Sequence, residues 1–481
     1  DSCAASHRAM DRRYYWPMQK GNAERTGLAT FAVPTNLSAG PTWTFTDPHN
    51  DVARSTPLID DEHNIYHATG AGRIYKFSAD GAVLWKVQMG GSIPVVPAIF
   101  NGSLFAILRS GEAFSVDMET GREQWKTPSF ARAEPDCASM LVTDGMLIFA
   151  TDNTAPNSGG NRKVIAVNVR DGRWKWTFLP DLPVYNFQAS SPGDGTIVFQ
   201  DGIGGVYRIN VTNGTLIWKS GVVDAHVGTT AAAVYHNGMV HAASSFPKAY
   251  KSEHGGQIIP VQTAVPGIVH SYNLSDGRLL WYQMLPQPAN QAVAVGPLGE
   301  GLASSVVVGI GANPGEAYGL RYLKKGYSRW MVGYLHWFGL NFPKWVSSPT
   351  PSAMSAFDAA TGEHQWSFQL APFQKPSTSG DDERFLSRLD DLTSQRNPFN
   401  DPLCLPDAMS QPVIAADGTA LQHWQDGRVY SVRDANRDGI IDAKTEVSWY
   451  DFKEGAQASL GLAPGLLAVA PCGGGLHVFK L

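Results

Sequence analysis

The segment SYNLSDGRLLW, residues 271–281, holds one complete copy of the unit from which this 481-residue chain is built. Its polar turn contains Gly277, and Trp281 stands four positions after that glycine, at the end of an apolar run. Two extended runs on either side of a tight turn are typical of a β-hairpin, and glycine best tolerates the positive φ of such a turn. The segment therefore predicts two antiparallel strands, with the tryptophan on the second.

Five other segments share this spacing between turn glycine and tryptophan: KFSADGAVLW (76–85), SVDMETGREQW (115–125), AVNVRDGRWKW (166–176), RINVTNGTLIW (208–218) and AFDAATGEHQW (356–366). In five of the six copies an Asp or Asn stands four residues before the glycine, where its side chain can accept hydrogen bonds from the backbone of the turn. Each tryptophan would lie flat between neighbouring sheets and bury on the order of 200 Å². The repeat thus predicts a ring of small sheets clamped to one another.

Two more tryptophans, in PTWTFTD and in VSWYDF, complete a set of eight predicted docking residues: Trp43, Trp85, Trp125, Trp176, Trp218, Trp281, Trp366 and Trp449. Eight docking residues predict an all-β fold, an eight-bladed β-propeller. The chain ends on LHVFKL, a strand with no outer strand after it, so we predict that the Trp43 strand closes the last sheet. Residues 1–36 are then a lead-in segment, and residues 37–481 form a single propeller.

The repeats resemble the pyrroloquinoline-quinone-type repeat of quinoprotein alcohol dehydrogenases and of the propeller lipoprotein of the bacterial outer-membrane barrel-assembly machine. The likeness covers about residues 16–481, and WPMQKGNAERTG, which begins at Trp16, is similar to the lead-in of that family. The resemblance implies an eight-bladed propeller. It does not decide the function, because this architecture hosts both catalytic and purely binding members.

The same resemblance indicates what a catalytic member would carry. Quinoprotein dehydrogenases of this family place the quinone in the central channel beneath two adjacent cysteines, with calcium held there by acid and amide side chains. This sequence has no adjacent cysteines and no C-x-x-C-H segment for haem. We therefore expect no quinone, assign no catalytic residue and favour the non-catalytic, barrel-assembly type of member. A quinone-dependent alcohol or sugar dehydrogenase is the alternative.

Four insertions interrupt the repeat. Consecutive docking tryptophans stand 40 to 85 residues apart, and the surplus falls at residues 152–162, 245–266, 310–352 and 370–408. The first three would join the second and third strands of a blade, and the fourth would join two blades. Both kinds of connection lie on one face of an up-and-down propeller. That face is the candidate functional face, because loops on a rigid scaffold commonly carry binding residues.

The insertion at 310–352 is rich in aromatic and basic residues. Residues 318–345 contain nine aromatic residues, five Lys or Arg and no acid. Apolar side chains recur there at helical spacing, which predicts a short amphipathic helix. The candidate partner-binding residues are Tyr327, Trp330, Tyr334, Trp337, Phe338 and Trp345.

Three interpretations of this helix stay open. It would cap the propeller with its aromatic side chains packed on blade 6, or it would dock on a protein or a membrane surface, for which Trp, Tyr and Arg are typical. The third interpretation is stacking on single-stranded nucleic acid, but no wider basic groove accompanies the helix, and the net charge is −5. We expect a protein partner or assembly, with a membrane surface as the second partner class, and no nucleic acid.

The segment DANRDGIID, residues 434–442, has the spacing of a calcium loop, in which several oxygen ligands surround a hard cation. The predicted ligands are the side chains of Asp434, Asn436, Asp438 and Asp442 and the backbone carbonyl of Ile440. The twelfth position is Thr445 rather than the bidentate Glu of an EF-hand, so the loop looks more like the D-x-N-x-D-G-x-x-D loops of extracellular calcium repeats. We predict a structural calcium ion that braces blade 7 on the face opposite the insertions.

Cysteines and sequons bear on the compartment. The four cysteines, Cys3, Cys137, Cys404 and Cys472, fit two disulfides in an oxidising compartment, although four buried thiols in a reducing one would also fit. The chain starts without a methionine, as after loss of a signal peptide, although a shortened sequence would look the same. No apolar stretch is long enough to predict a transmembrane helix. Five N-glycosylation sequons favour a secreted or lumenal glycoprotein, and they begin at Asn36, Asn101, Asn210, Asn213 and Asn273.

Overall fold

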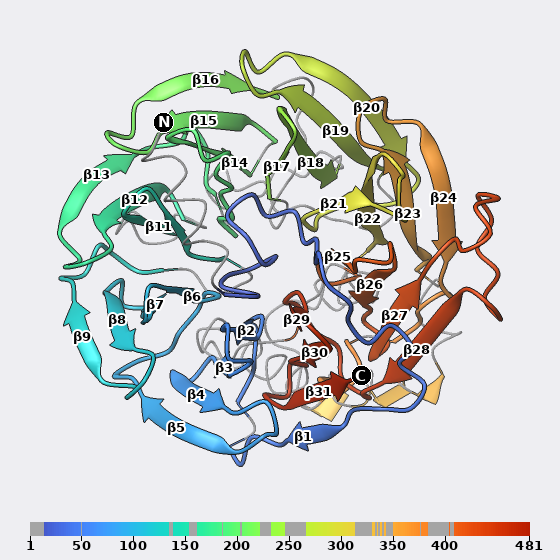
Figure 1. Ribbon diagram of the computed structural model, residues 1–481, viewed down its shortest axis with the longest axis horizontal. Helices are drawn as coiled ribbons and strands as arrows, with labels where there is room; N and C mark the ends of the chain where they lie inside the picture. The colour runs from blue at the N-terminus through green and yellow to red at the C-terminus, as the bar shows by residue number, and fades with distance from the viewer. Residues whose placement is uncertain are drawn as a thin grey trace.

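The computed structural model describes residues 14–49, 51–133, 138–152, 161–184, 186–202, 204–221, 232–245, 266–312, 350–375, 377–382, 404 and 408–481. Between 313 and 349 it describes residues 330, 331, 334, 337, 338, 341 and 342. The chain forms eight antiparallel sheets arranged in a ring (Figure 1). The predicted all-β, eight-bladed propeller is therefore confirmed.

The blades follow one another in chain order, and within blades 1 to 7 the strands run from the centre of the ring outward. Blades 1 and 2 contain β2 (Leu58–Ile59), β3 (Ile65–Ala68), β4 (Arg73–Phe77) and β5 (Val83–Gln88), then β6 (Ala98–Phe100), β7 (Ser103–Ile107), β8 (Ala113–Asp117) and β9 (Glu123–Lys126). Blades 3 and 4 contain β10 (Leu141–Thr143), β11 (Met146–Thr151), β12 (Lys163–Asn168) and β13 (Trp174–Phe178), then β14 (Thr196–Gln200), β15 (Val206–Asn210) and β16 (Leu216–Ser220). An isolated bridge from Ser190 to Val198 continues blade 4 inward.

The second half of the ring has the same plan. Blades 5 and 6 contain β17 (Val234–His236), β18 (Met239–Ser245), β19 (Gly267–Asn273) and β20 (Leu279–Leu285), then β21 (Ala294–Pro297), β22 (Ser304–Gly311), β23 (Ser352–Asp358) and β24 (His364–Gln369). Blades 7 and 8 contain β25 (Val413–Ile414), β26 (Ala420–His423), β27 (Arg428–Val432) and β28 (Val447–Asp451), then β29 (Gly461–Ala463), β30 (Leu466–Val469), β31 (Leu476–Lys480) and β1 (Trp43–Phe45).

Blade 8 takes its outer strand from the N-terminal part of the chain. Strand β1 pairs antiparallel with β31, and Trp43 lies opposite Val478 (Figure 1). The two strands come from opposite ends of the described chain, so their pairing joins the first blade to the last. Pairing of this kind leaves no open edge at the seam of the ring.

Docking tryptophans clamp neighbouring blades through one recurring contact. A Cβ atom added to the turn glycine of blades 1 to 6 would lie only 2.5–3.0 Å from the tryptophan ring of the preceding blade, at Gly81, Gly121, Gly172, Gly214, Gly277 and Gly362. The same glycines have φ between 68° and 87°, so both the ring contact and the backbone require glycine. The indole N–H of Trp281, for example, donates to the backbone carbonyl of Ala359 in the next blade at 3.0 Å.

Trp449 does not occupy the docking position predicted for it. In blades 1, 2, 3, 4, 5 and 6 a register shift between the two outer strands follows the turn, and it places Trp366, for example, opposite Ala356. Strands β27 and β28 pair without that shift, so Trp449 lies opposite Tyr430. A β-bulge adds one residue to a strand, and its loss turns the following side chains to the other face.

Tyr450 takes the docking position in blade 7. Its ring lies 3.1 Å from the position of a Cβ atom on Gly40, which precedes β1. The ring also contacts Phe479 of blade 8, with centroids 5.7 Å apart. Trp449 instead is 47% exposed. Six of the inter-blade contacts therefore use a tryptophan, and the contact between blades 7 and 8 uses a tyrosine.

The long connections all leave the ring on one face, which we call the insertion face. They run from β11 to β12, from β18 to β19, from β22 to β23 and from β24 to β25. Because successive strands are antiparallel, the connections between second and third strands share a face with those between blades. The connection from β27 to β28, with residues 434–442, leaves on the opposite face.

Candidate functional site

The lead-in segment crosses the axis of the ring, and residues 14–32 contact every blade. Figure 1 shows this dark-blue trace in the middle of the ring, ahead of β1. Backbone hydrogen bonds of 2.8–3.1 Å join it to seven blades, at Ile59, Ile99, Ser191, Tyr235, Val295, Ile414 and Gly465. The side chain of Arg25 reaches the remaining one, blade 3, at the carbonyl of Met140. The segment therefore fills the described part of the axial channel as a central strap.

Two buried cations lie in this strap. Lys20 donates to the carbonyl of Pro412, and Arg25 donates to the carbonyls of Gln19 at 2.6 Å, Met140 at 2.7 Å and Ala189 at 3.0 Å. Burial lowers the pKa of Lys20 well below its usual value and lowers the pKa of Arg25 to about 9. Carbonyl dipoles offset part of the cost of burying these charges.

The backbone at Lys20 and Arg25 is left-handed, with φ of 66° and 62°. Non-glycine residues adopt this region at a cost, and the surrounding contacts must hold them there. Hydrogen bonds from both side chains to different blades supply such contacts. The strap is thus held in one conformation by its bonds to the blades. The sequence showed only the likeness of this segment to a family lead-in.

Polar side chains of the strap also bond to residues next to the innermost strands of two blades. Gln19 of the strap accepts from Thr56 and donates to Gln411 at 2.9 Å, so it links blades 1 and 7, which flank blade 8. Among the residues that the structure describes, which include the predicted calcium ligands Asp434, Asp438 and Asp442, no group of three or more His, Cys, Asp or Glu could hold a metal ion.

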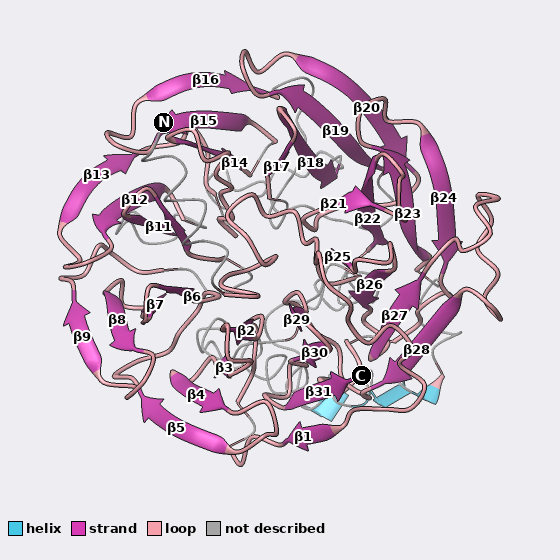
Figure 2. Ribbon diagram, viewed as in Figure 1, coloured by secondary structure: helices cyan, strands magenta, loops and turns pink. Residues whose placement is uncertain are grey.

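The insertion between β22 and β23 carries exposed aromatic rings. Trp330, Met331, Tyr334, Trp337, Phe338 and Asn341 are helical, and they are drawn in cyan in Figure 2. We call the side chains of Trp330, Tyr334, Trp337, Phe338 and Phe342 the aromatic array. The ring of Tyr334 lies 5.9 Å from that of Trp330, 6.0 Å from that of Trp337 and 6.3 Å from that of Phe338.

The aromatic array is largely open to solvent. Trp330 is 79% exposed, Trp337 is 52% exposed and Phe342 is 44% exposed. Rings packed on blade 6 as a cap would be buried, so these exposures favour the docking interpretation of the helix. Two of the predicted partner-binding residues, Tyr327 and Trp345, lie outside the described residues.

The side chains of the predicted calcium loop are engaged with the loop itself. Asp434 accepts from the backbone N–H of Gly439 at 3.0 Å, and Asp438 accepts from that of Ile440 at 2.8 Å. Glu446, which the sequence pattern left out, accepts from the N–H groups of Ala435 and Asp442, both at 2.8 Å. A calcium ion would share these oxygens with the turn or draw them away from it.

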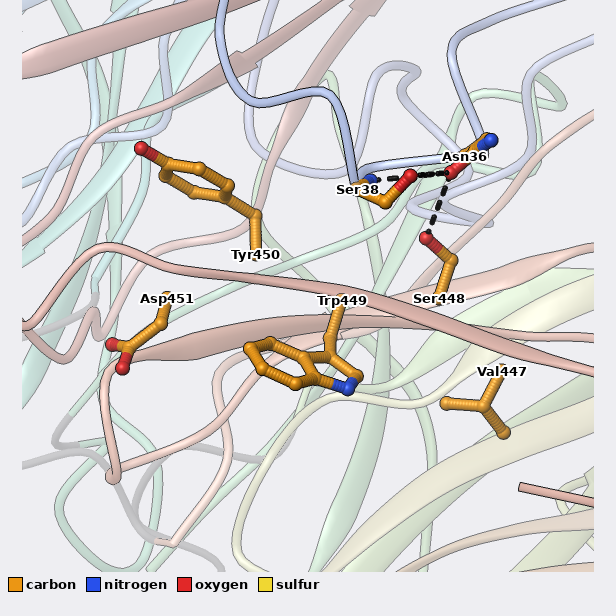
Figure 3. A pocket seen from close by; sticks show the side chains of 7 residues that line it. All are labelled: Asn36, Ser38, Val447, Ser448, Trp449, Tyr450 and Asp451. Atoms are coloured by element: carbon orange, nitrogen blue, oxygen red, sulfur yellow. Dashed lines mark hydrogen bonds between the residues drawn. The ribbon is translucent and has the colours of Figure 1, made fainter. Parts of the chain in front are cut away.

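A surface cavity of about 560 Å³ lies at the seam beside Trp449, lined by Asn36, Ser38, Val447, Ser448, Trp449, Tyr450 and Asp451 (Figure 3). The guanidinium of Arg428 lies 4.5 Å from the centre of the Trp449 ring. Asn36 accepts from the hydroxyls of Ser38 at 2.7 Å and Ser448 at 3.3 Å. The cavity is a consequence of the missing bulge in blade 7. Without the register shift Trp449 does not dock on the next blade, and its indole stays exposed.

The predicted glycosylation sites fall into two groups. Asn36, Asn101 and Asn213 are exposed. Asn210 and Asn273 are half-buried, and the side-chain oxygen of each accepts a backbone N–H of its own turn at 2.8 Å. The second pair therefore serves the fold of the repeat.

One disulfide joins Cys404 to Cys472 across a sequence separation of 68 residues. It ties the connection before β25 to the connection between β30 and β31, both on the insertion face. Cys3 and Cys137 lie outside the described residues. Within the described part of the chain, none of the helical segments has the length and apolar character to cross a bilayer.

Comparisons with known proteins agree with this fold. Residues 70–246, somewhat more than a third of the chain, match the family model described as outer membrane protein assembly factor BamB. No curated protein matches the sequence.

Solved structures resemble the chain over most of its length. The crystal structure of BamB from Moraxella catarrhalis has a TM-score of 0.57 and 12% identity, and the alignment covers 92% of this chain and 99% of that one. Quinohemoprotein alcohol dehydrogenase from Comamonas testosteroni has a TM-score of 0.60 and 11% identity, with 100% and 84% covered. The enzyme ADHIIG from Pseudomonas putida HK5 has a TM-score of 0.62 and 11% identity, with 99% and 82% covered.

At these identities the structural likeness shows the fold, which a binding protein and dehydrogenases share. Residues 70–246 therefore resemble the BamB family model in sequence, and the ring of eight blades has the fold of these solved structures.

Proposed function

We propose that this propeller is a non-catalytic scaffold that docks on a larger assembly outside the cytoplasm through its insertion face. The observation that carries the proposal is the aromatic array, in which Trp330 is 79% exposed. Exposed clusters of large apolar side chains mark interaction sites, and tryptophan and tyrosine dominate the binding energy of interfaces. The BamB family model is named for an assembly factor, which supports the same interpretation.

Two features support a rigid scaffold in an oxidising compartment. The central strap bonds to all eight blades, which opposes relative motion of the sheets. The Cys404–Cys472 disulfide is of the kind that persists outside reducing compartments. Structural calcium in the loop at 434–442 and glycans on exposed sequons belong to the same proposal.

The test removes the anchors and leaves the ring intact. The double variant Trp330→Ala/Trp337→Ala is compared with Trp174→Ala, which removes a tryptophan that is 57% exposed on β13, outside the insertion. Truncation of buried interface anchors costs about 2 kcal/mol or more, which is about a 30-fold weaker Kd. We expect this loss of affinity for the native assembly only in the double variant. Equal binding by both variants would refute the proposed docking site.

The dehydrogenase is the alternative function, because two of the similar structures are quinohemoprotein alcohol dehydrogenases. Its test is reduction of a dye by an alcohol or a sugar after pyrroloquinoline quinone and calcium are added to the purified chain. Turnover that depends on both additions would replace the scaffold proposal.

A further inference from the structure

We infer that the aromatic array is an interfacial anchor for a lipid bilayer that contains anionic lipid. The inference rests on the proposed docking function and names the surface on which the scaffold docks. It places the insertion face toward the bilayer.

The geometry of the array suits a fluid surface. Its rings follow one another along one short helical stretch, with neighbouring centroids 5.0–6.3 Å apart. Trp330, Trp337 and Phe342 keep between 44% and 79% of their surface in water. Aromatic side chains with an apolar body and a polar edge favour the headgroup level of a bilayer, where lipids pack around each ring and no preformed pocket is needed.

The charge around the array selects anionic lipid. Residues 318–345 carry five positive charges and no negative ones, whereas the whole chain carries a net charge of −5. The remainder of the chain therefore has a net charge of −10 and is repelled by an anionic surface. Basic residues next to an aromatic segment are attracted to such a surface, and each adds to the affinity. The contrast between segment and remainder orients the molecule as well as binding it.

The described helical residues of this insertion lie between 330 and 341, and no helix among the described residues is long and apolar enough to cross a membrane. A short segment with aromatic rings on one side and positive charge nearby is typical of a helix that lies in the plane of the interface. The array is therefore assigned to the surface of the bilayer.

The test uses the purified chain and vesicles without any other protein. Co-sedimentation is measured with vesicles of phosphatidylcholine alone and with phosphatidylserine added, at low and high salt, for the unaltered chain, Trp330→Ala/Trp337→Ala and Trp174→Ala. We expect binding to the vesicles with phosphatidylserine, weakened by salt. Removal of about 60 Å² of ring surface from an interface is enough for a tenfold change. The double variant should therefore bind at least about tenfold more weakly, and Trp174→Ala should bind like the unaltered chain.

Other outcomes overturn the inference. Equal binding to both kinds of vesicle, or equal binding by the double variant, would show that the array does not recognise anionic lipid. If the unaltered chain ignores all vesicles while the double variant loses its native assembly, the anchor is for a protein: the lipid inference fails and the scaffold proposal stands. If neither vesicles nor the native assembly respond to the double variant, both fail. Circular dichroism and an unchanged urea midpoint confirm that each variant is folded.

Discussion

Truncation of a docking tryptophan should destabilise the ring far more than truncation of Trp449. Trp281 is 9% exposed, its indole N–H donates to the carbonyl of Ala359 at 3.0 Å, and its ring covers Gly362. Large-to-small changes of a buried Trp cost about 3–5 kcal/mol, because apolar contact is lost and a cavity remains. Trp449 is 47% exposed, so Trp449→Ala should cost about 1 kcal/mol or less.

The measurement is urea unfolding of Trp281→Ala and Trp449→Ala beside the unaltered chain, followed by far-UV circular dichroism. The free energy of unfolding should fall by about 4 kcal/mol for Trp281→Ala, with the slope m unchanged. The Trp449→Ala curve should lie close to that of the unaltered chain. Equal losses for the two variants would mean that Trp449 docks after all, and that the missing register shift in blade 7 has no energetic effect.

Three further outcomes are expected. Burial lowers the pKa of His241 to about 3 and that of His423 to about 4, below the usual 6.5. The two imidazoles therefore bind protons more readily in the unfolded chain than in the folded one. The stability from each neutral imidazole is present above pH 6.5 and is lost as the pH falls toward 4, so the free energies of unfolding from urea curves at pH 7 and pH 5 should differ by about 2 kcal/mol per histidine; a free energy of unfolding independent of pH would contradict this burial. Chelation of calcium should lower the Tm of the unaltered chain but not that of Asp438→Asn, and an unchanged Tm in both would show that hydrogen bonds alone hold the loop. Mass spectrometry of glycopeptides from the native source should find glycan at Asn213, which is exposed, in preference to Asn210, which is half-buried; the reverse order would contradict this assignment.

The ring could be predicted from the sequence because its determinants are local. Each turn glycine and its tryptophan lie within a few residues of each other, so one hairpin pattern repeats visibly along the chain. Trp449 fits that pattern by eye, yet the residue that docks is Tyr450. The difference is that β27 and β28 pair without the bulge of the other blades. The turn of blade 7 is longer than the others, so the spacing along the sequence does not reveal that the bulge is missing.

The central strap could not be predicted in the same way. Its partners, from Ile59 to Gly465, are spread over almost the whole chain, and most of its bonds use backbone atoms, which every residue type offers. The sequence indicated only that WPMQKGNAERTG, which begins at Trp16, is similar to a family lead-in. For the aromatic array, the sequence indicated the residues and the helix, whereas the exposure of Trp330 needed three-dimensional coordinates.

The pairing of β1 with β31 also constrains how the molecule is made. Trp43 leaves the ribosome long before its partner Val478 has been synthesised. The same holds for the strap. Its bonds to Ile59 and Ile99 can form once blades 1 and 2 are made, whereas the bond between Ala32 and Gly465 requires nearly the whole chain. Contacts between such distant residues form slowly, because a long loop must close before they are gained. During synthesis the first blades therefore stand as an open arc, and their unpaired edges stay exposed to aggregation until the last strand arrives.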